Sequence, residues 1–366
     1  MNILIDASAA YQYHSTGIGA YATELLNALR TLPIAEQISV FDGSSIRPLN
    51  TEDRRKAETR CDFWEQAAEN PQGNARGFDL YHNLHNGIGM KAGSKKTLIT
   101  VHDMIPLIYP SYCGASYRER FQKEVPAAME KADGILTVSE NSKADILRFT
   151  TVAAERIHVI PEAPKHHCKP LPAEECADYL FARYHVKPPF FLYVGGFNPR
   201  KNVAGLLRGY AAVYRRFPRP CPLVIIGRDG SRRRELEALS KSLHIDGLTH
   251  FCGDVPEEAL PYFYNLCYGL IYPSFYEGFG LPPLEAAACA APVITTKGSS
   301  LREVMGDAAL YIDAHSPQSI GAGLLQLLQK EELRHTIAER AYHRSRLFSY
   351  KKTAQKTAAL YEKICR

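Results

Sequence analysis

Residues 272–285 read YPSFYEGFGLPPLE, and this stretch decides how the rest of the chain is interpreted. The apolar run Gly269–Tyr272 at its start has the length of a β-strand, and the two consecutive prolines suit the first turn of an α-helix. Glu277 therefore falls on a loop after a strand, and Glu285 in the first turns of a helix. This order predicts a parallel α/β sheet, in which ligands bind at the carboxyl ends of the strands.

The rest of the chain alternates in the same way, from short apolar runs to helical patterns. This alternation predicts two doubly wound, Rossmann-like domains, with the ligand in the cleft between them. A length of 366 residues suits two such domains. The expected strands are Asn2–Asp6, Ile38–Phe41, Leu80–His82, Thr97–Val101, Gly134–Val138, His158–Ile160, Phe190–Val194, Leu223–Ile226, Leu248–Phe251, Gly269–Tyr272, Val293–Thr295 and Leu310–Ile312.

The expected domain boundaries follow from a Pro-rich break in this alternation. We expect an N-terminal domain over residues 1–165, a connection over 166–188, a C-terminal domain over 189–348 and a terminal helix over 349–366. Residues 43–77 are polar and poorly periodic, and a loop with a short helix is expected there.

Composition excludes several classes of protein. The chain is 45% hydrophobic and 23% charged, as in globular proteins, and its net charge of +5 permits an anionic ligand without indicating nucleic acid. No apolar run reaches membrane-spanning length and no export signal is visible, so a cytoplasmic location is expected. The nine cysteines include no C-x-x-C pair, which argues against zinc or a disulfide framework. The cluster His166-His167-Cys168 is interpreted as part of a solvated linker.

A second motif, YVGGFNPRKN over residues 193–202, places Arg200 and Lys201 where a helix begins. Two cations beside a glycine pair at a helix N-terminus suit a diphosphate. Taken alone, the motif is explained slightly better by an ordinary strand-to-helix turn with solvated basic residues. In the same way, Glu285 alone could simply complement a helix dipole, and Glu277 could be a surface residue.

Two further motifs lie in the first half of the chain. Residues 6–21, DASAAYQYHSTGIGAY, carry a Gly-x-Gly after a strand, but not the full dinucleotide fingerprint. Residues 98–103, LITVHD, end a strand in His102 and Asp103. A histidine at a strand end is more often structural than catalytic, and Asp103 is the expected partner that orients its ring.

Taken together, these motifs resemble glycosyltransferase family 4, whose members have the GT-B fold of two Rossmann-like domains with a last helix that crosses back to the first. Glu277 and Glu285 match the family's E-x7-E signature. The resemblance implies that Glu285 binds the ribose, that Glu277 contacts the donor sugar, and that the backbone of the intervening loop contacts sugar hydroxyls. It also implies that Arg200 and Lys201 stabilise a departing pyrophosphate and that His102 lies next to the reacting sugar.

The remaining site residues follow from the same resemblance, which is greatest to a mannosyltransferase-B-like branch. The expected catalytic residues are Arg200, Lys201, Glu277 and His102. The expected acceptor-side residues are Tyr21 and Asp103. The expected donor-binding residues are Gly17, Gly19, Gly196, Arg228, Gly253, Asp254, Val255, Gly278, Phe279, Gly280, Leu281 and Glu285.

The resemblance implies a retaining transfer of a hexosyl group to a hydroxyl of a saccharide or a lipid-linked acceptor. GDP-mannose is the favoured donor, and UDP-sugars or activated deoxysugars are alternatives. No D-x-D triplet occurs in the chain, so we expect no metal and no other cofactor. A sugar-nucleotide epimerase of the same fold and a non-catalytic sugar-binding protein are the remaining alternatives. The expected helix 115–131 carries several basic residues, which would suit a membrane surface. Its interspersed glutamates favour the alternative that it packs as an ordinary helix.

Overall fold

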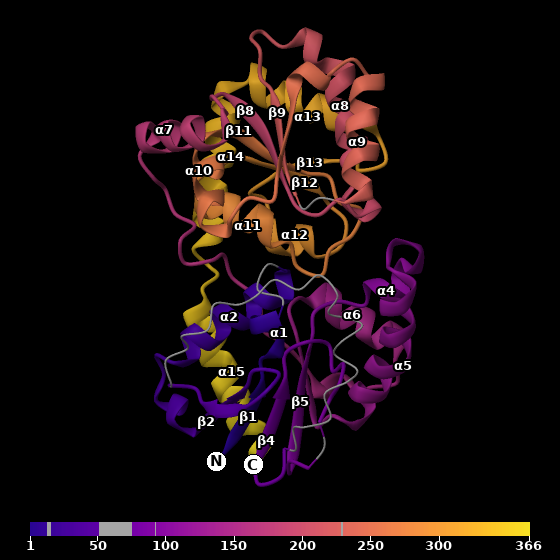
Figure 1. The fold of residues 1–366 in the computed structure, drawn as a ribbon, viewed down its shortest axis with the longest axis vertical. Coiled ribbons are helices and arrows are strands. Elements are labelled where there is room, and N and C mark those ends of the chain that lie inside the picture. The colour runs from indigo at the N-terminus through magenta and orange to yellow at the C-terminus, as the bar shows by residue number, and fades with distance from the viewer. Residues whose placement is uncertain (13–15, 51–74, 92, 228–229) are drawn as a thin grey trace. The chain divides into compact units, whose positions relative to one another are not determined.

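The computed structural model describes residues 1–12, 16–50, 75–91, 93–227 and 230–366. It divides into two compact units (Figure 1), one made of Met1–Glu162 with Phe348–Arg366 and the other of Ala163–Leu347. Each unit is a largely parallel β-sheet flanked by helices, as the alternation of apolar runs predicted.

In the first unit, the described residues form one seven-stranded sheet in the order β3-β2-β1-β4-β5-β6-β7. Neighbours pair in parallel, except that β3 runs antiparallel to β2. Helices cover both faces of a parallel sheet, which is why β1 and β6 are buried along their whole length. The strands are β1 Ile3–Asp6, β2 Ile38–Phe41, β3 Ile46–Pro48, β4 Leu80–Asn83, β5 Lys96–Val101, β6 Gly134–Thr137 and β7 Ile157–Val159.

Strand β3 lies within residues 43–77, where a loop with a short helix was expected. This edge strand has exposed or half-exposed side chains, so it lacks the apolar pattern by which the other strands were predicted. Residues 51–74 of the same stretch lie outside the described residues.

The first unit also contains the helix that carries the basic residues, α5 (Ala115–Lys131). Phe121, Val125 and Met129 are fully buried in its apolar core cluster, which favours the interpretation as a packed helix. In the described residues, no helix combines the length and the apolar character that crossing a bilayer requires. The other helices of this unit are α1 Ser8–Gln12, α2 Gly17–Leu29, α4 Ile105–Ile108, α6 Glu140–Phe149 and α15 Tyr350–Cys365, with short 3₁₀ helices at Pro33–Gln37, Pro110–Tyr112 and Ala154–Arg156.

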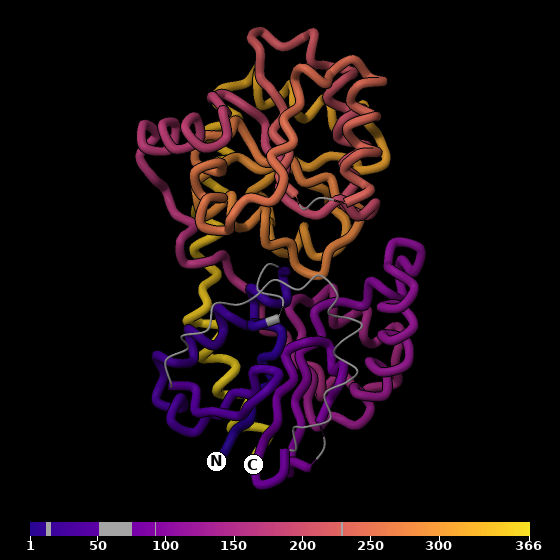
Figure 2. The backbone as a smooth tube through the Cα atoms, viewed as in Figure 1, coloured from indigo at the N-terminus to yellow at the C-terminus, as the bar shows by residue number. Residues whose placement is uncertain are grey.

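The terminal helix α15 belongs to the first unit and packs against α2, which confirms the predicted return of the chain. Figure 2 shows the C-terminal segment (yellow) running beside the N-terminal one (indigo). Tyr361 is fully buried, with its hydroxyl 2.8 Å from Nδ1 of His82. Thr353 donates from its hydroxyl to the carbonyl of Pro161 at 2.8 Å.

In the second unit, six described strands form a parallel sheet in the order β10-β9-β8-β11-β12-β13. Helices α8, α9 and α13 lie on one side of it, and α10, α11 and α14 on the other (Figure 1). The strands are β8 Phe190–Val194, β9 Leu223–Ile226, β10 Thr249–Gly253, β11 Cys267–Tyr272, β12 Val293–Thr296 and β13 Leu310–Ile312. The helices are α7 Ala173–Tyr184, α8 Val203–Val213, α9 Ser231–Ser242, α10 Leu260–Leu266, α11 Leu281–Ala288, α12 Ser300–Met305, α13 Pro317–Gln329 and α14 Glu331–Ser345, with 3₁₀ helices at Pro199–Lys201, Tyr214–Arg216, Asp246–Leu248 and Glu257–Ala259.

Residues 166–188, expected as a connection between domains, lie inside this second unit. The reason is α7, which packs on α10. The ring of Tyr179 stacks on Tyr262 with centroids 4.1 Å apart, and Leu180 is fully buried. The chain therefore passes between the units at Glu162 and Ala163, before the Pro-rich segment rather than along it.

Candidate functional site

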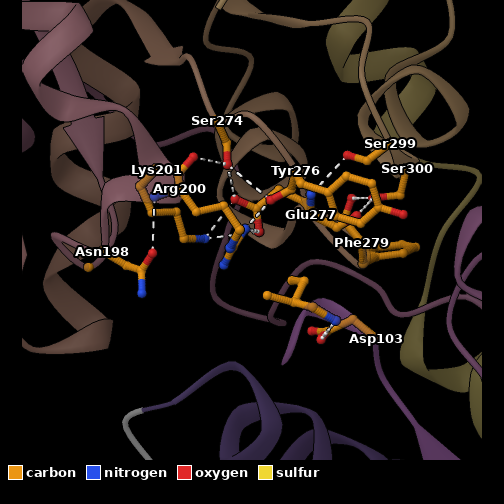
Figure 3. Close-up of polar contacts among 12 residues, drawn as sticks. Asp103, Asn198, Arg200, Lys201, Ser274, Tyr276, Glu277, Phe279, Ser299 and Ser300 are labelled. Atoms are coloured by element: carbon orange, nitrogen blue, oxygen red, sulfur yellow. Dashed lines mark hydrogen bonds and ion pairs between the residues drawn. The ribbon is translucent and has the colours of Figure 1, made fainter. Parts of the chain in front are cut away.

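The carboxylate of Glu277 binds two cations (Figure 3). Arg200 lies 2.8 Å from Oε2 through Nη1, and Lys201 lies 2.8 Å from Oε1 through Nζ. Glu277 follows β11, and the two cations follow β8, which is the neighbour of β11 in the sheet. The carboxyl ends of adjacent parallel strands thus bring together the two motifs that the sequence separates by 76 residues.

Short hydrogen bonds fix this cluster in place. Lys201 also donates to the hydroxyl of Tyr272 at 2.6 Å, and Ser274 donates to Oε1 of Glu277 at 2.6 Å. Arg200 additionally donates to the carbonyl of Tyr276. With donors on both carboxylate oxygens, the charges are held in position before any ligand arrives, which is what electrostatic catalysis requires.

Burial makes the ionisation of Glu277 depend on its partners. Desolvation raises the pKa of the Glu277 carboxyl, but the charges of Arg200 and Lys201 and the hydrogen bonds outweigh it, and the pKa falls to about 2. The carboxylate is therefore ionised at neutral pH. Two cations against one carboxylate leave an excess of positive charge, which suits an anionic ligand.

The loop after Glu277 continues directly into α11. Its backbone is bound by two serines: Ser299 accepts from the N–H of Glu277 at 2.8 Å, and Ser300 donates to the carbonyls of Glu277 and Phe279 at 2.9 and 2.8 Å. Gly280 caps the helix with φ at +108°, and a Cβ there would lie 2.6 Å from Cδ2 of Leu301. Only glycine fits this position without strain. The predicted loop residues Gly278–Leu281 thus form a rigid turn beside the cations.

Glu285 lies in α11 and is buried, 3% exposed. The hydroxyl of Tyr264 donates to its Oε2 at 3.1 Å. Lys165 lies 3.5 Å from Oε1 through Nζ. Sequence reasoning missed Lys165, because it stands at the end of the expected N-terminal domain, beside the expected connection, and no motif marks it.

The other predicted donor residues of the second unit lie at further strand ends of the same sheet. Gly253 ends β10 with φ at +72° and accepts from the N–H of Gly227 at 3.1 Å, and Asp254 and Val255 follow it. The carbonyl of Gly196, after β8, accepts from the hydroxyl of Tyr193 at 2.8 Å. Arg228 lies outside the described residues.

In the first unit, His102 directly follows β5 and has both ring nitrogens next to acceptors. Nδ1 lies 3.2 Å from Oε1 of Glu162, and Nε2 lies 3.0 Å from the carbonyl oxygen of Leu84. Burial lowers the pKa of His102, but the hydrogen bond and charge of Glu162, the Leu84 carbonyl and the charge of Asp103 raise it above its ordinary value. A ring that is protonated on both nitrogens satisfies both acceptors.

Asp103, the expected orienting partner, instead accepts from the N–H of Ile105 at 2.9 Å and fixes the start of α4. Sequence reasoning missed Glu162, although it follows a predicted strand end directly. Tyr21, expected on the acceptor side, is fully buried, and its ring meets the ring of His102 edge-on with centroids 4.9 Å apart. In this conformation Tyr21 supports the histidine.

Gly17 and Gly19 form the first turn of α2. Thr16 caps this helix by accepting from the N–H of Gly19 at 3.1 Å. A Cβ at Gly17 would meet no atom of the described residues within 4 Å. Among the described residues, no three His, Cys, Asp or Glu side chains are grouped as metal ligands, and the expectation of metal-independent chemistry remains a prediction.

Comparisons with known proteins fit this geometry. The model of the family Glycosyl transferases group 1 matches residues 182–344. Over 98% of its length the chain is 29% identical to O-antigen chain mannosyltransferase B of Escherichia coli, and the match covers 99% of that protein.

Among solved structures, the chain is similar to sucrose-phosphate synthase of Thermosynechococcus elongatus, with a TM-score of 0.75, 19% identity and coverage of 100% of this chain and 99% of the other. It is also similar to HepE of Anabaena in complex with UDP and glucose, with a TM-score of 0.71, 16% identity and coverage of 99% and 100%. These likenesses confirm the predicted GT-B fold.

Proposed function

Because the chain belongs to the glycosyl transferases group 1 family and is a glycosyltransferase, we propose that it moves a mannosyl group from GDP-mannose to a hydroxyl of a saccharide, with retention at the anomeric carbon. The observation that carries this proposal is the binding of Arg200 and Lys201 to Glu277 at two adjacent strand ends. The choice of mannose rests on the nearly full-length likeness to an O-antigen chain mannosyltransferase.

The chemistry that this cluster supports is the departure of a diphosphate. The bond between the anomeric carbon and the β-phosphate oxygen breaks, and negative charge grows on the leaving GDP. Arg200 and Lys201 stabilise that charge in the transition state, where the gain in rate is largest. The acceptor oxygen attacks on the face that the phosphate leaves and gives its proton to a phosphate oxygen, so that GDP leaves with the proton and the configuration is retained.

Donor binding is assigned to residues around this cluster. Glu285 accepts hydrogen bonds from ribose hydroxyls, and the backbone of Gly278–Leu281 bonds the sugar. The loop Gly253–Val255 holds the base. Gly196, Gly17 and Gly19 allow backbone N–H groups to approach the phosphates.

His102 is not assigned as a general base, because both of its ring nitrogens already lie next to acceptors, the Glu162 carboxylate and the Leu84 carbonyl. To contact the transferred sugar, the His102 ring would give up its hydrogen bond to the Leu84 carbonyl and form one to a sugar hydroxyl. Asp103 is assigned to the acceptor side. The acceptor is a saccharide, free or lipid-linked, and a cytoplasmic location with peripheral contact to a membrane fits a lipid-linked one.

A thermal-shift panel of GDP, UDP, dTDP and ADP with their sugars tests this proposal. We expect GDP and GDP-mannose to raise the melting temperature. Stabilisation by UDP-sugars alone would overturn the choice of donor and leave the transferase activity standing. Stabilisation by none of the nucleotides would overturn the proposal. Incubation with the donor alone then separates transfer from epimerisation, because an epimerase converts the sugar without an acceptor.

A further inference from the structure

Lys165 is a buried cation that directly precedes the segment expected as a connection between the domains. Its side chain is about nine-tenths buried. Its ammonium lies 2.8 Å from Oε1 of Glu257 and 3.5 Å from Oε1 of Glu285. Burial lowers the pKa of Lys165, but the charges of Glu285 and Glu257 raise it above its ordinary value, so the side chain carries its charge at neutral pH.

The carboxylate of Glu285 has one oxygen that is satisfied and one that is not. Tyr264 donates to Oε2. Oε1 is buried and accepts no hydrogen bond from any described residue, because the ammonium of Lys165 lies next to it without hydrogen-bond geometry. A buried carboxylate oxygen without a donor is costly, so this oxygen is suited to accept from a bound ligand.

We propose that Lys165 is a positioning residue of the nucleotide site, which holds the Glu285 carboxylate with its Oε1 aimed at a ribose hydroxyl. The inference rests on the proposed function, in which Glu285 binds the ribose. A charged acceptor makes a stronger hydrogen bond to a hydroxyl than a neutral one does. Without the cation, the buried carboxylate would lose the positive charge beside its Oε1.

A purely structural role for Lys165 predicts something different. If Lys165 only anchors its segment to Glu257, its loss weakens every nucleotide equally. If it acts through Glu285, its loss removes the preference for a nucleotide with a complete ribose. The 2′-hydroxyl therefore separates the two roles.

The experiment is a titration of the full chain with GDP and with 2′-deoxy-GDP by isothermal calorimetry. The wild type is expected to prefer GDP by about tenfold, the value of one charge-assisted hydrogen bond. Lys165→Met should bind GDP about tenfold more weakly and bind both nucleotides alike. Lys165→Arg, which keeps the charge, should restore part of the preference. Lys169→Met, the same change at a nearby exposed position, should match the wild type.

A second variant keeps the test informative if Lys165→Met does not fold. Glu257→Gln leaves Glu285 as the acidic partner of Lys165, so the preference for GDP should persist, and its loss would overturn the inference. An unchanged preference for GDP in Lys165→Met, or an equal loss of affinity for both nucleotides, would also overturn the inference. The proposed function would still stand. If the wild type binds UDP instead, the corresponding UDP pair is used. If the wild type binds neither, the proposed function fails.

Discussion

The ammonium of Lys201 lies 2.8 Å from Oε1 of Glu277, so the basic motif and the acidic motif of the second unit meet in one ion cluster. Arg200 completes it from the other carboxylate oxygen. The cations are thus positioned by the residue that was expected to contact the sugar. The proposed diphosphate would find them already in place, and Glu277 limits their mutual repulsion in the free protein.

Glu277→Gln should destabilise the protein, because it leaves two cations without their carboxylate. We expect a loss of about 3 kcal/mol in the free energy of unfolding, measured in urea. Saturating GDP should recover part of the loss, since its phosphates replace the missing charge. Glu331→Gln, at an exposed ion pair, should change stability by less than about 0.5 kcal/mol. A variant as stable as the wild type would show that the cluster is not preformed.

The low pKa of Glu277 predicts how its contribution depends on pH. The carboxyl has a pKa of about 2 in the folded chain against an ordinary 4.5, so its stabilisation is complete above pH 4.5. The stabilisation is lost as the pH falls from 4.5 towards 2, and it amounts to roughly 3 kcal/mol at neutral pH. The difference in unfolding free energy between wild type and Glu277→Gln should shrink over that range. A difference that does not vary with pH would contradict the ion cluster.

The stabilisation by the pair of His102 and Glu162 should depend on pH in the opposite direction, so that it is lost as the pH rises. Because the pKa of His102 is raised, the stabilisation is complete below the ordinary value of about 6.5 and is lost as the pH rises through the folded pKa. Glu162→Gln should lower the pKa of His102, measured by NMR of the ring protons. The charge of Asp103 also raises the pKa of this ring, His82 and His85 interact with it electrostatically, and the ring of Tyr21 packs against it. An unchanged pKa in Glu162→Gln would assign the upward shift to the Leu84 carbonyl and the charge of Asp103.

Gly280→Ala tests the turn that joins Glu277 to α11. An added Cβ would approach Leu301 to 2.6 Å at a backbone angle that L-residues rarely adopt. We expect a loss of about 1–3 kcal/mol in stability and a higher KM for the donor. Gly247→Ala, where the added atom meets open space among the described residues, is the control. If Gly280→Ala keeps the wild-type KM, the turn does not hold the sugar.

The sequence predicted those parts of the fold that leave an apolar pattern. Strands such as Phe190–Val194 are buried on both faces and stand out as unbroken apolar runs. The edge strand Ile46–Pro48 is exposed and left no such signal. Residues 166–188 were expected to form a connection between the domains. Their place in the second unit depends on the packing of Tyr179 on Tyr262, and a contact between residues so far apart in the chain leaves no local pattern.

The sequence predicted the site residues that belong to a motif. It missed the site residues whose neighbours are determined by tertiary contacts. Arg200, Lys201, Glu277 and Glu285 lie in two recognisable motifs. Glu162 and Lys165 lie outside both, at the end of the expected N-terminal domain, and only folding brings them to His102 and Glu285. Charge complementarity between distant residues is invisible to a local pattern.

The role of Lys201 in the departure of the diphosphate is tested most directly by the single-turnover rate of transfer at saturating GDP-mannose. Lys201→Met should lower this rate by about 10²-fold or more, because the lost charge acts mainly on the transition state. Lys330→Met, at an exposed position of the same unit, should leave the rate unchanged. A wild-type rate in Lys201→Met would contradict the assignment of the cluster to the leaving diphosphate.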